Sequence, residues 1–181
     1  MSLVGFHAQN HPQQQTSGQM LPSLADLGSR VDRVDDRAIR DADWEPLHAR
    51  FRFTIDAAAS AHNAKLPRYW TLEDDSLSQS WKHERVWCNP PYSNISPWVD
   101  KAWTEWGKRL CPDLIVMLLP ANRTEQLWWQ NAVEPLLREQ RGDFHCEFLA
   151  GRMRFDRPGA VIGPKGDRPP FGCCLLIWGS P

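Results

Sequence analysis

Residues 86–94 read Val86-Trp87-Cys88-Asn89-Pro90-Pro91-Tyr92-Ser93-Asn94, an apolar run that stops at an asparagine and two prolines. The apolar run predicts a buried strand, and proline cannot donate to a sheet ladder, so the strand must end at this point. Each proline ring holds its own φ at about −65°, which makes the following turn stiff and extended. Open α/β sheets bind their ligands just beyond the carboxyl ends of strands. This stretch therefore predicts both a sheet edge and a candidate site.

Three groups on this turn suit a flat heterocycle that carries an amino group. The side-chain amide oxygen of Asn89 and the carbonyl oxygen of Pro90 can accept the two amino hydrogens. The ring of Tyr92 can stack on the base. A turn after a strand can also contain Asn-Pro-Pro for purely structural reasons, so the tetrapeptide by itself leaves that alternative open.

Other segments have the patterns of strands. Phe51–Ile55 alternates apolar and polar residues, which is typical of a half-exposed strand, whereas Asp113–Pro120 is apolar nearly throughout. Cys146–Leu149 and Cys173–Trp178 are expected to be the last two strands. With helical patterns between the strands, the chain is expected to form an α/β fold whose sheet is mostly parallel and ends in an antiparallel C-terminal hairpin.

Helix signals lie between these strands. Ser96 is expected to be the N-cap of a helix with Pro97 at its first position, and Gly107 is expected to end that helix. Thr124 is expected to cap a second helix that runs through Val133. The alanine-rich segment after Asp56 predicts a tight turn into a further helix.

The length of 181 residues suits one α/β domain. Residues 1–40 are expected to be a disordered tail and a charged linker, because they are polar, carry alternating charges and lack apolar periodicity. Residues 41–181 are expected to form the folded domain. The Pro- and Gly-rich loop from Pro158 to Pro170 is long enough to suggest a functional role.

Composition excludes several classes of protein. Hydrophobic residues make up 41% and charged residues 24%, which is ordinary for a globular domain. No apolar run approaches the ~20 residues that a membrane-spanning helix needs, and no secretory signal pattern is present. Five cysteines without Cys-x-x-Cys spacing argue against a zinc site and a disulfide framework, and favour a reducing cytoplasm. The net charge of −1 neither predicts nor excludes DNA binding, which depends on local basic surface.

The sequence resembles the small phage-type DNA adenine N6-methyltransferases, the Dam-like family, over roughly residues 43–178. The resemblance implies a Rossmann-like, S-adenosylmethionine-dependent methyltransferase fold. It also implies site-specific transfer of a methyl group from S-adenosylmethionine to N6 of adenine in double-stranded DNA. The segments that carry it are Phe53–Ser60, Asn63–Lys65, Leu77–Trp81, Val86–Ser93 and Gly151–Phe155.

The resemblance assigns roles to individual residues. The expected catalytic residues are Asn89, Pro90, Pro91 and Tyr92. The expected cofactor-binding residues are Asp56, Ala57, Ala58 and Ala59, together with Glu73, Asp74 and Asp75. The alternative for the alanines is an ordinary helix start. A carboxylate that follows the second strand of such folds often binds the ribose of a nucleoside, which is the reason for expecting a role for Glu73, Asp74 or Asp75. The alternative for these three carboxylates is a solvated acidic turn.

The expected DNA contacts are Asn94, Arg123, Arg152 and Arg154. Arg123 follows a predicted strand, so it is expected at the same sheet edge as Asn89. The family further implies a phage or prophage protein that acts in the cytoplasm of a bacterial host. We expect a monomer with no metal and no membrane partner.

Two alternatives remain open at this point. The same tetrapeptide serves enzymes that methylate protein glutamine amides or RNA amino groups, although those usually have a glycine-bearing cofactor turn. A methyltransferase-like module that binds nucleic acid without activity is the second alternative. It rests on one departure from the family pattern, because Ala38–Pro46 lacks the Thr-Pro that family members tend to have upstream of the first strand.

Overall fold

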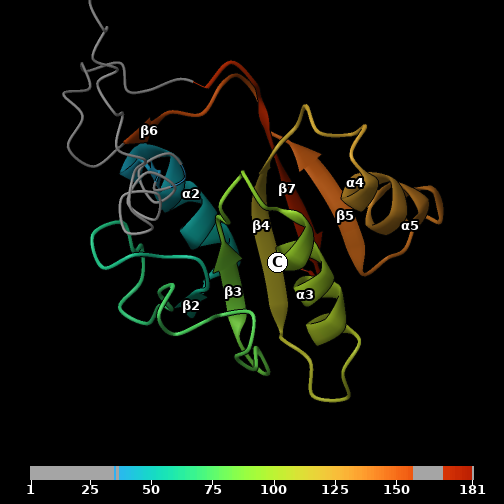
Figure 1. Ribbon diagram of the computed structural model, residues 1–181, viewed down its shortest axis with the longest axis horizontal. Coiled ribbons are helices and arrows are strands. Elements are labelled where there is room, and N and C mark those ends of the chain that lie inside the picture. The colour runs from blue at the N-terminus through green and yellow to red at the C-terminus, as the bar shows by residue number, and fades with distance from the viewer. Residues whose placement is uncertain (1–34, 36, 157–168, 181) are drawn as a thin grey trace, which may run out of the picture.

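The structure is a computed structural model, and it describes residues 35, 37–156 and 169–180. Its centre is a five-stranded sheet in the order β2-β3-β4-β7-β5 (Figure 1). The strands are β2 (Ile55–Asp56), β3 (Arg85–Cys88), β4 (Leu114–Pro120), β5 (Phe144–Phe148) and β7 (Cys173–Trp178). The strands predicted around Val86, after Asp113, after Cys146 and after Cys173 are therefore confirmed.

The sheet has mixed strand directions. β2 pairs with β3 and β3 pairs with β4 in parallel, whereas β7 is antiparallel to both of its neighbours, β4 and β5. The antiparallel pairing of the last two long strands was predicted and is confirmed. β7 lies between β4 and β5 and is the one reversed strand among the five, so four strands share a direction although two of the four pairings are antiparallel. The described sheet is therefore of mixed orientation, as the predicted antiparallel hairpin requires, with the reversed strand inserted inside the sheet and not at its edge.

Helices and a small second sheet cover the two faces of the large sheet (Figure 1). One face packs against α3 (Ser96–Trp106) and α4 (Leu127–Ala132), which is followed by α5 (Glu134–Arg138). The other face packs against α2 (Asp41–Phe51) and a two-stranded antiparallel sheet of β1 (Ala38–Ile39) and β6 (Phe155–Asp156). The result is a three-layered α/β arrangement.

β4 shows why a central strand is apolar along its whole length. Ile115, Met117 and Leu119 belong to the core cluster on the α3 side. Leu114, Val116 and Leu118 belong to the cluster on the α2 side. Successive side chains of a strand point to opposite faces, so a strand that is covered on both faces needs apolar residues at every position.

The strand predicted at Phe51–Ile55 is wrong over most of its length. α2 continues through Phe51, and the chain then turns at Arg52, whose positive φ of 50° ends the helix. Phe51, Phe53 and Ile55 are all buried, so the apolar alternation is real. This alternation of buried residues arises from the end of α2, from Arg52 in the left-handed conformation and from the two-residue edge strand β2, and not from one continuous strand.

The helix predicted after Asp56 is absent, and the segment forms turns instead. Side-chain oxygens accept the backbone N–H groups that a helix would use. Asp56 accepts from Ala58 (3.4 Å) and Lys65 (3.1 Å), and Asn63 accepts from Ser60 (2.7 Å). Asp and Asn side chains compete with helical bonding in this way.

Both predicted N-caps differ from the structure. α3 begins at Ser96 itself, with Ile95 as its N-cap, and Gly107 ends it as predicted. α4 begins at Leu127 with Gln126 as its N-cap, and neither helix has a side-chain cap bond. The helix predicted to run from Thr124 through Val133 is therefore shorter, and α5 begins immediately after Val133.

Two predictions fall on parts of the chain that the structure leaves undescribed. The tail and most of the linker (residues 1–34 and 36), and most of the Pro158–Pro170 loop (residues 157–168), lie outside the described residues. The described end of the linker includes β1, where Ile39 is buried. Among the helices that the structure describes, none has the length and apolarity to span a membrane.

Candidate active site

A cavity of about 270 Å³ lies where β3 ends. Four separate parts of the chain line it: the segment before β1, the Asn-Pro-Pro-Tyr turn, the segment that follows β4 and the segment that precedes β7. The lining residues are Asp35, Arg37, Asn89, Pro90, Tyr92, Ser93, Arg123 and Phe171. The turn and the arginine that the sequence predicts to be at one sheet edge therefore share one cavity.

The side chain of Asn89 is held in a defined orientation. Its Nδ2 donates a hydrogen bond of 3.0 Å to the backbone carbonyl of Arg37. This bond uses one of the two N–H donors of the amide and sets which end of the amide faces Arg37, so the amide oxygen is the acceptor that remains for a ligand. No described residue donates a hydrogen bond to that oxygen.

The carbonyl oxygen of Pro90 is also available. No hydrogen bond to it is made by any residue within 35, 37–156 and 169–180. The turn closes one residue later, where the N–H of Asn94 donates to the carbonyl of Pro91 at 3.1 Å. Neither Asn94, which is exposed, nor Pro91 lines the cavity. Their backbone hydrogen bond instead helps to set the shape of the turn that does line it.

Tyr92 is half-buried against two phenylalanines. Its ring makes T-shaped contacts with Phe155 (6.5 Å, 88°) and Phe171 (6.0 Å, 61°). It has no parallel-stacked partner in the part of the chain that the structure describes. Its hydroxyl is buried beside the thiol of Cys173, with no nitrogen or oxygen partner among the described residues, and burial raises the pKa of this hydroxyl well above its usual value.

Arg123 lies in the turn that follows β4, and β4 is parallel to β3, so the carboxyl ends of both strands meet at one edge of the sheet. Its Nε is buried and has no hydrogen-bond partner among the described residues. A buried donor without a partner is costly, so this nitrogen is a natural contact for a ligand oxygen or ring nitrogen.

Sequence reasoning missed the contribution of the segment before β1. The carboxylate of Asp35 accepts a hydrogen bond from the N–H of Ser93 (3.3 Å) and another from its hydroxyl. Together with the bond between Asn89 and Arg37, this fastens residues 35 and 37 across the turn. Asp35 and Arg37 stand in a run of alternating charges, which gave no signal that they line a cavity.

The predicted cofactor residues at the end of β2 lie beside this site. Asp56 pairs with Trp87 of β3, and the N–H of Ala57 donates to the carbonyl of Trp87 at 2.8 Å. Asp56 is buried, and burial raises the pKa of its carboxyl to about 6. Ala58 and Ala59 are half-buried, and their small side chains allow another molecule to approach closely.

The acidic turn of Glu73, Asp74 and Asp75 is exposed. Asp74 holds the turn itself, because its carboxylate accepts hydrogen bonds from the N–H (2.8 Å) and the hydroxyl (2.9 Å) of Thr71. These bonds lower the pKa of Asp74. The three carboxylates line neither the cavity at Asn89 nor the one described next. No group of metal-binding side chains occurs among the described residues.

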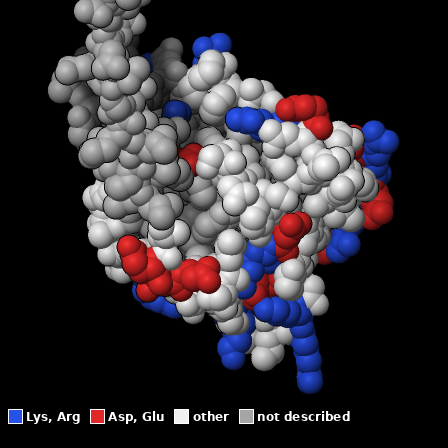
Figure 2. All heavy atoms as spheres, in the orientation of Figure 1, with Lys and Arg blue, Asp and Glu red and all other residues white. Residues whose placement is uncertain are grey.

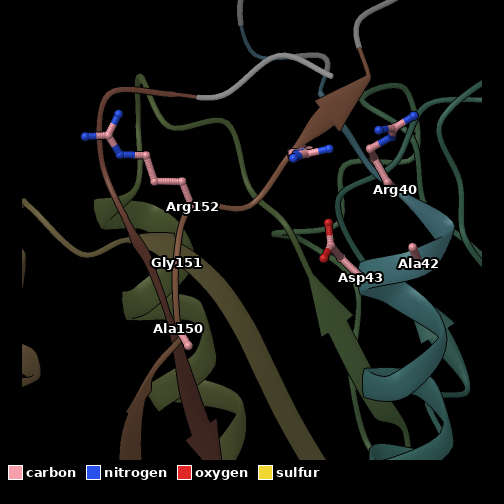
Figure 3. A pocket seen from close by; sticks show the side chains of 7 residues that line it. Arg40, Ala42, Asp43, Ala150, Gly151 and Arg152 are labelled. Carbon is pink, nitrogen blue, oxygen red and sulfur yellow. The ribbon is translucent and has the colours of Figure 1, made fainter. Parts of the chain in front are cut away.

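A second cavity, of about 620 Å³, lies between the start of α2 and the connection from β5 to β6 (Figure 3). Two of the predicted DNA-contacting residues, Arg152 and Arg154, line it. They are therefore not brought into the cavity that contains Asn89 and Arg123. The remaining lining residues are Arg40, Ala42, Asp43, Ala150 and Gly151.

Comparison with known proteins identifies the protein family to which this chain belongs. The family described as DNA N-6-adenine-methyltransferase (Dam) matches residues 39–155, and this chain belongs to that family. Two curated relatives are both named DNA N-6-adenine-methyltransferase. The protein of Haemophilus phage HP1 is 37% identical over 68 residues, which is 38% of this chain. The protein of Escherichia phage T1 is 35% identical over 94 residues, which is 49% of this chain. Each match covers only 38% of the relative's own length.

Proposed function

We propose that this protein is a site-specific DNA methyltransferase that transfers the methyl group of S-adenosylmethionine to N6 of adenine in double-stranded DNA. We further propose that its mixed α/β sheet is a Rossmann-like methyltransferase fold. Family membership supports both proposals, and so does the position of the candidate site beyond the carboxyl ends of the parallel strands β3 and β4.

One observation carries the proposal. Asn89 and Pro90 line the same cavity, and the oxygen that each offers accepts no hydrogen bond from the described residues. Two acceptors on adjacent residues match the two hydrogens of an exocyclic amino group. The bond to Arg37 keeps the amide of Asn89 from presenting its nitrogen instead.

These acceptors address the low reactivity of the adenine amino group, whose lone pair is delocalised into the ring. Hydrogen bonds to both amino hydrogens would draw the nitrogen toward tetrahedral geometry and free its lone pair for attack. Asn89 does not ionise, so it would stabilise developing positive charge as a fixed dipole. The new bond from nitrogen to the methyl carbon would replace the bond from that carbon to sulfur, with S-adenosylhomocysteine as the leaving group, and one of the two amino protons would then leave to water. Much of the acceleration would come from alignment of the reacting atoms.

Tyr92 and Arg123 would hold the target base. A base inside a duplex must be swung out before it can be methylated, and the ring of Tyr92, which lines the cavity, would receive it. Such stacking is worth about 1–3 kcal/mol per base. The buried Nε of Arg123 would donate to the base or its phosphate, and Asn94 lies at the exposed side of the same turn.

The residues at the end of β2 fit the cofactor. S-adenosylmethionine would supply the methyl group. The buried carboxyl of Asp56 braces the turn that would carry the cofactor, and Ala57, Ala58 and Ala59 leave room beside it. Glu73 and Asp75 are the exposed carboxylates that would accept hydrogen bonds from the ribose, since Asp74 is engaged with Thr71.

The phage origin of the two relatives supports a phage or prophage source and action in the cytoplasm of a bacterial host. Double-stranded DNA is the proposed partner, and the protein is proposed to act as a monomer.

The test is a transfer assay with methyl-labelled S-adenosylmethionine and unmethylated duplex DNA. We expect label on adenine N6, and we expect Asn89→Ala to lower kcat by about a hundredfold or more, because it removes an acceptor at the reacting nitrogen. Asn131→Ala is the matched control, since Asn131 lies exposed on α4. It should leave kcat unchanged.

Other results would redirect the proposal. Label on protein or RNA instead of DNA would favour an amide or RNA methyltransferase. No cofactor binding by calorimetry would favour a module that binds nucleic acid without activity. Equal activity of Asn89→Ala and wild type would contradict the proposed role of the turn.

A further inference from the structure

The cavity between α2 and the β5–β6 connection is lined by three arginines from two distant parts of the chain. Arg40 precedes α2, and Arg152 and Arg154 follow β5. Asp43 is the one acidic residue among the lining residues, so the lining carries more positive than negative charge. Figure 3 shows Arg152 rising from the connection on one side, with Arg40 and Asp43 on the other.

The arginines point outward because their neighbours are anchored in the core. Met153 and Phe155 are buried in the cluster that packs on α2. Successive side chains of an extended segment alternate in direction. Burial of Met153 and Phe155 therefore directs Arg152 and Arg154 to the opposite side, where they are exposed and half-buried respectively.

Arg152 and Arg154 have no acidic partner among the residues that the structure describes, whereas Arg40 lies 3.4 Å from a carboxylate oxygen of Asp156. On the face seen in Figure 2, basic and acidic side chains are intermingled, so that face offers no broad basic surface. The arginine-lined cavity is a local cluster of positive charge in a chain whose net charge is −1.

The cavity lies close to the candidate active site. Arg37 lines the cavity at Asn89, and Arg40 lines the arginine cavity, three residues along an extended segment. At a rise of about 3.3 Å per residue, the two positions are about 10 Å apart. On the opposite strand, Phe155 contacts Tyr92 edge to face while its neighbour Arg154 lines the arginine cavity.

We propose that this cavity binds phosphodiester groups of the DNA within a few nucleotides of the target adenine, with Arg152 and Arg154 as the main contacts and Arg40 beside them. The inference rests on the proposed function. A volume of about 620 Å³ is far larger than one phosphate ion needs, so the cavity has room for more than a single phosphate group. Contacts of this kind position a duplex and carry no sequence information.

The experiment is a salt titration of binding to a fluorescent, unmethylated duplex with the full chain. Each phosphate that a protein neutralises adds about 0.9 to the steepness of log K against log salt. We expect Arg152→Gln and Arg154→Gln each to reduce this slope by about 1, and the double variant by about 2, with unchanged affinity for S-adenosylmethionine. Arg152→Lys should retain the slope because it retains the charge.

Arg109→Gln is the matched control. Arg109 is exposed on the loop before β4, at the opposite edge of the sheet, and should leave the slope unchanged. Equal slopes for wild type and the double variant would overturn the inference while leaving methylation intact. Altered slopes in a protein that transfers no methyl group would support the phosphate site and contradict the proposed function.

A phosphate group in this cavity could come from the DNA backbone or from free phosphate, and a titration with inorganic phosphate distinguishes the two. If millimolar phosphate raised the thermal midpoint of wild type but not of the double variant, while both bound duplex with equal slopes, the cavity would be a site for free phosphate and not for DNA. Reduced slopes in the double variant without any effect of inorganic phosphate would support the DNA assignment.

Discussion

The amide nitrogen of Asn89 donates a 3.0 Å hydrogen bond to the carbonyl of Arg37, a residue 52 positions earlier in the chain. The contact joins the turn after β3 to the segment that precedes β1. We call Asp35 together with residues 37–40 the N-terminal strap. Because the strap fixes which atom of the amide faces the cavity, we infer that it positions Asn89 without touching the reacting atoms.

Loosening the strap should slow methyl transfer. Ser93→Ala removes the hydroxyl that bonds the carboxylate of Asp35. A hydrogen bond of this kind is worth about 0.5–1.5 kcal/mol net, so we expect kcat to fall about 2- to 10-fold with little change in cofactor affinity. Steady-state kinetics with labelled cofactor would measure this. Ser96→Ala, at the exposed start of α3, is the control, and an equal loss in both variants would argue against a positioning role.

The ring of Tyr92, and not its hydroxyl, should matter for activity. The hydroxyl is buried without a nitrogen or oxygen partner among the described residues, so Tyr92→Phe should leave stability equal or higher by up to about 1 kcal/mol. Activity should be retained. Tyr92→Ala should lower kcat/KM about 5- to 150-fold, because it removes a stacking contact of about 1–3 kcal/mol. Loss of activity in Tyr92→Phe would show that the hydroxyl takes part in the reaction.

Asp56 should make stability fall as pH rises. Burial raises its pKa from the usual 3.8 to about 6, so between these values the folded protein binds a proton that the unfolded chain releases. Stability from this group is therefore present below about pH 4 and lost by about pH 6, with an effect of about 3 kcal/mol. Urea unfolding across this range should show that the stability of wild type relative to Asp56→Asn declines as pH rises, since the other carboxylates contribute equally to both proteins. Parallel curves for the two proteins would contradict the raised pKa.

Glu105 should be a structural residue of α3. Its side chain is fully buried, and its carboxylate accepts hydrogen bonds from Lys101 (2.6 Å), from Lys108 and from the N–H of Trp81 (3.2 Å). Glu105→Ala leaves the nearly buried ammonium of Lys101 and the N–H of Trp81 without their carboxylate partner. We expect a loss of about 3–5 kcal/mol in urea unfolding.

Lys108→Ala is the comparison for this ion pair, since Lys108 is 47% exposed and should cost less than about 1 kcal/mol. Equal losses for Glu105→Ala and Lys108→Ala would show that the carboxylate is not the centre of this network.

Long apolar segments were predictable because their patterns report burial directly. β4, β7 and the part of β3 after Arg85 are continuous apolar runs, and Gly107 ends α3 as its position in the sequence indicates. Short segments were less predictable. At Phe51–Ile55 the same alternation arises from a helix end and a short strand, because burial of side chains does not specify the backbone between them.

In the candidate site, too, the local features were predictable from the sequence and the long-range contacts were not. The sequence alone determined that Asn89, Pro90 and Tyr92 stand on a stiff turn after a strand, since two prolines restrict the backbone locally. It also placed Arg123 at the same edge, because strands that run parallel end together. Only the tertiary structure decided that Asp35 and Arg37 close the cavity and that Arg40 meets Arg152 and Arg154 across another. These pairs lie far apart in the chain, and no local pattern encodes a contact that exists only once the strands and α2 have packed.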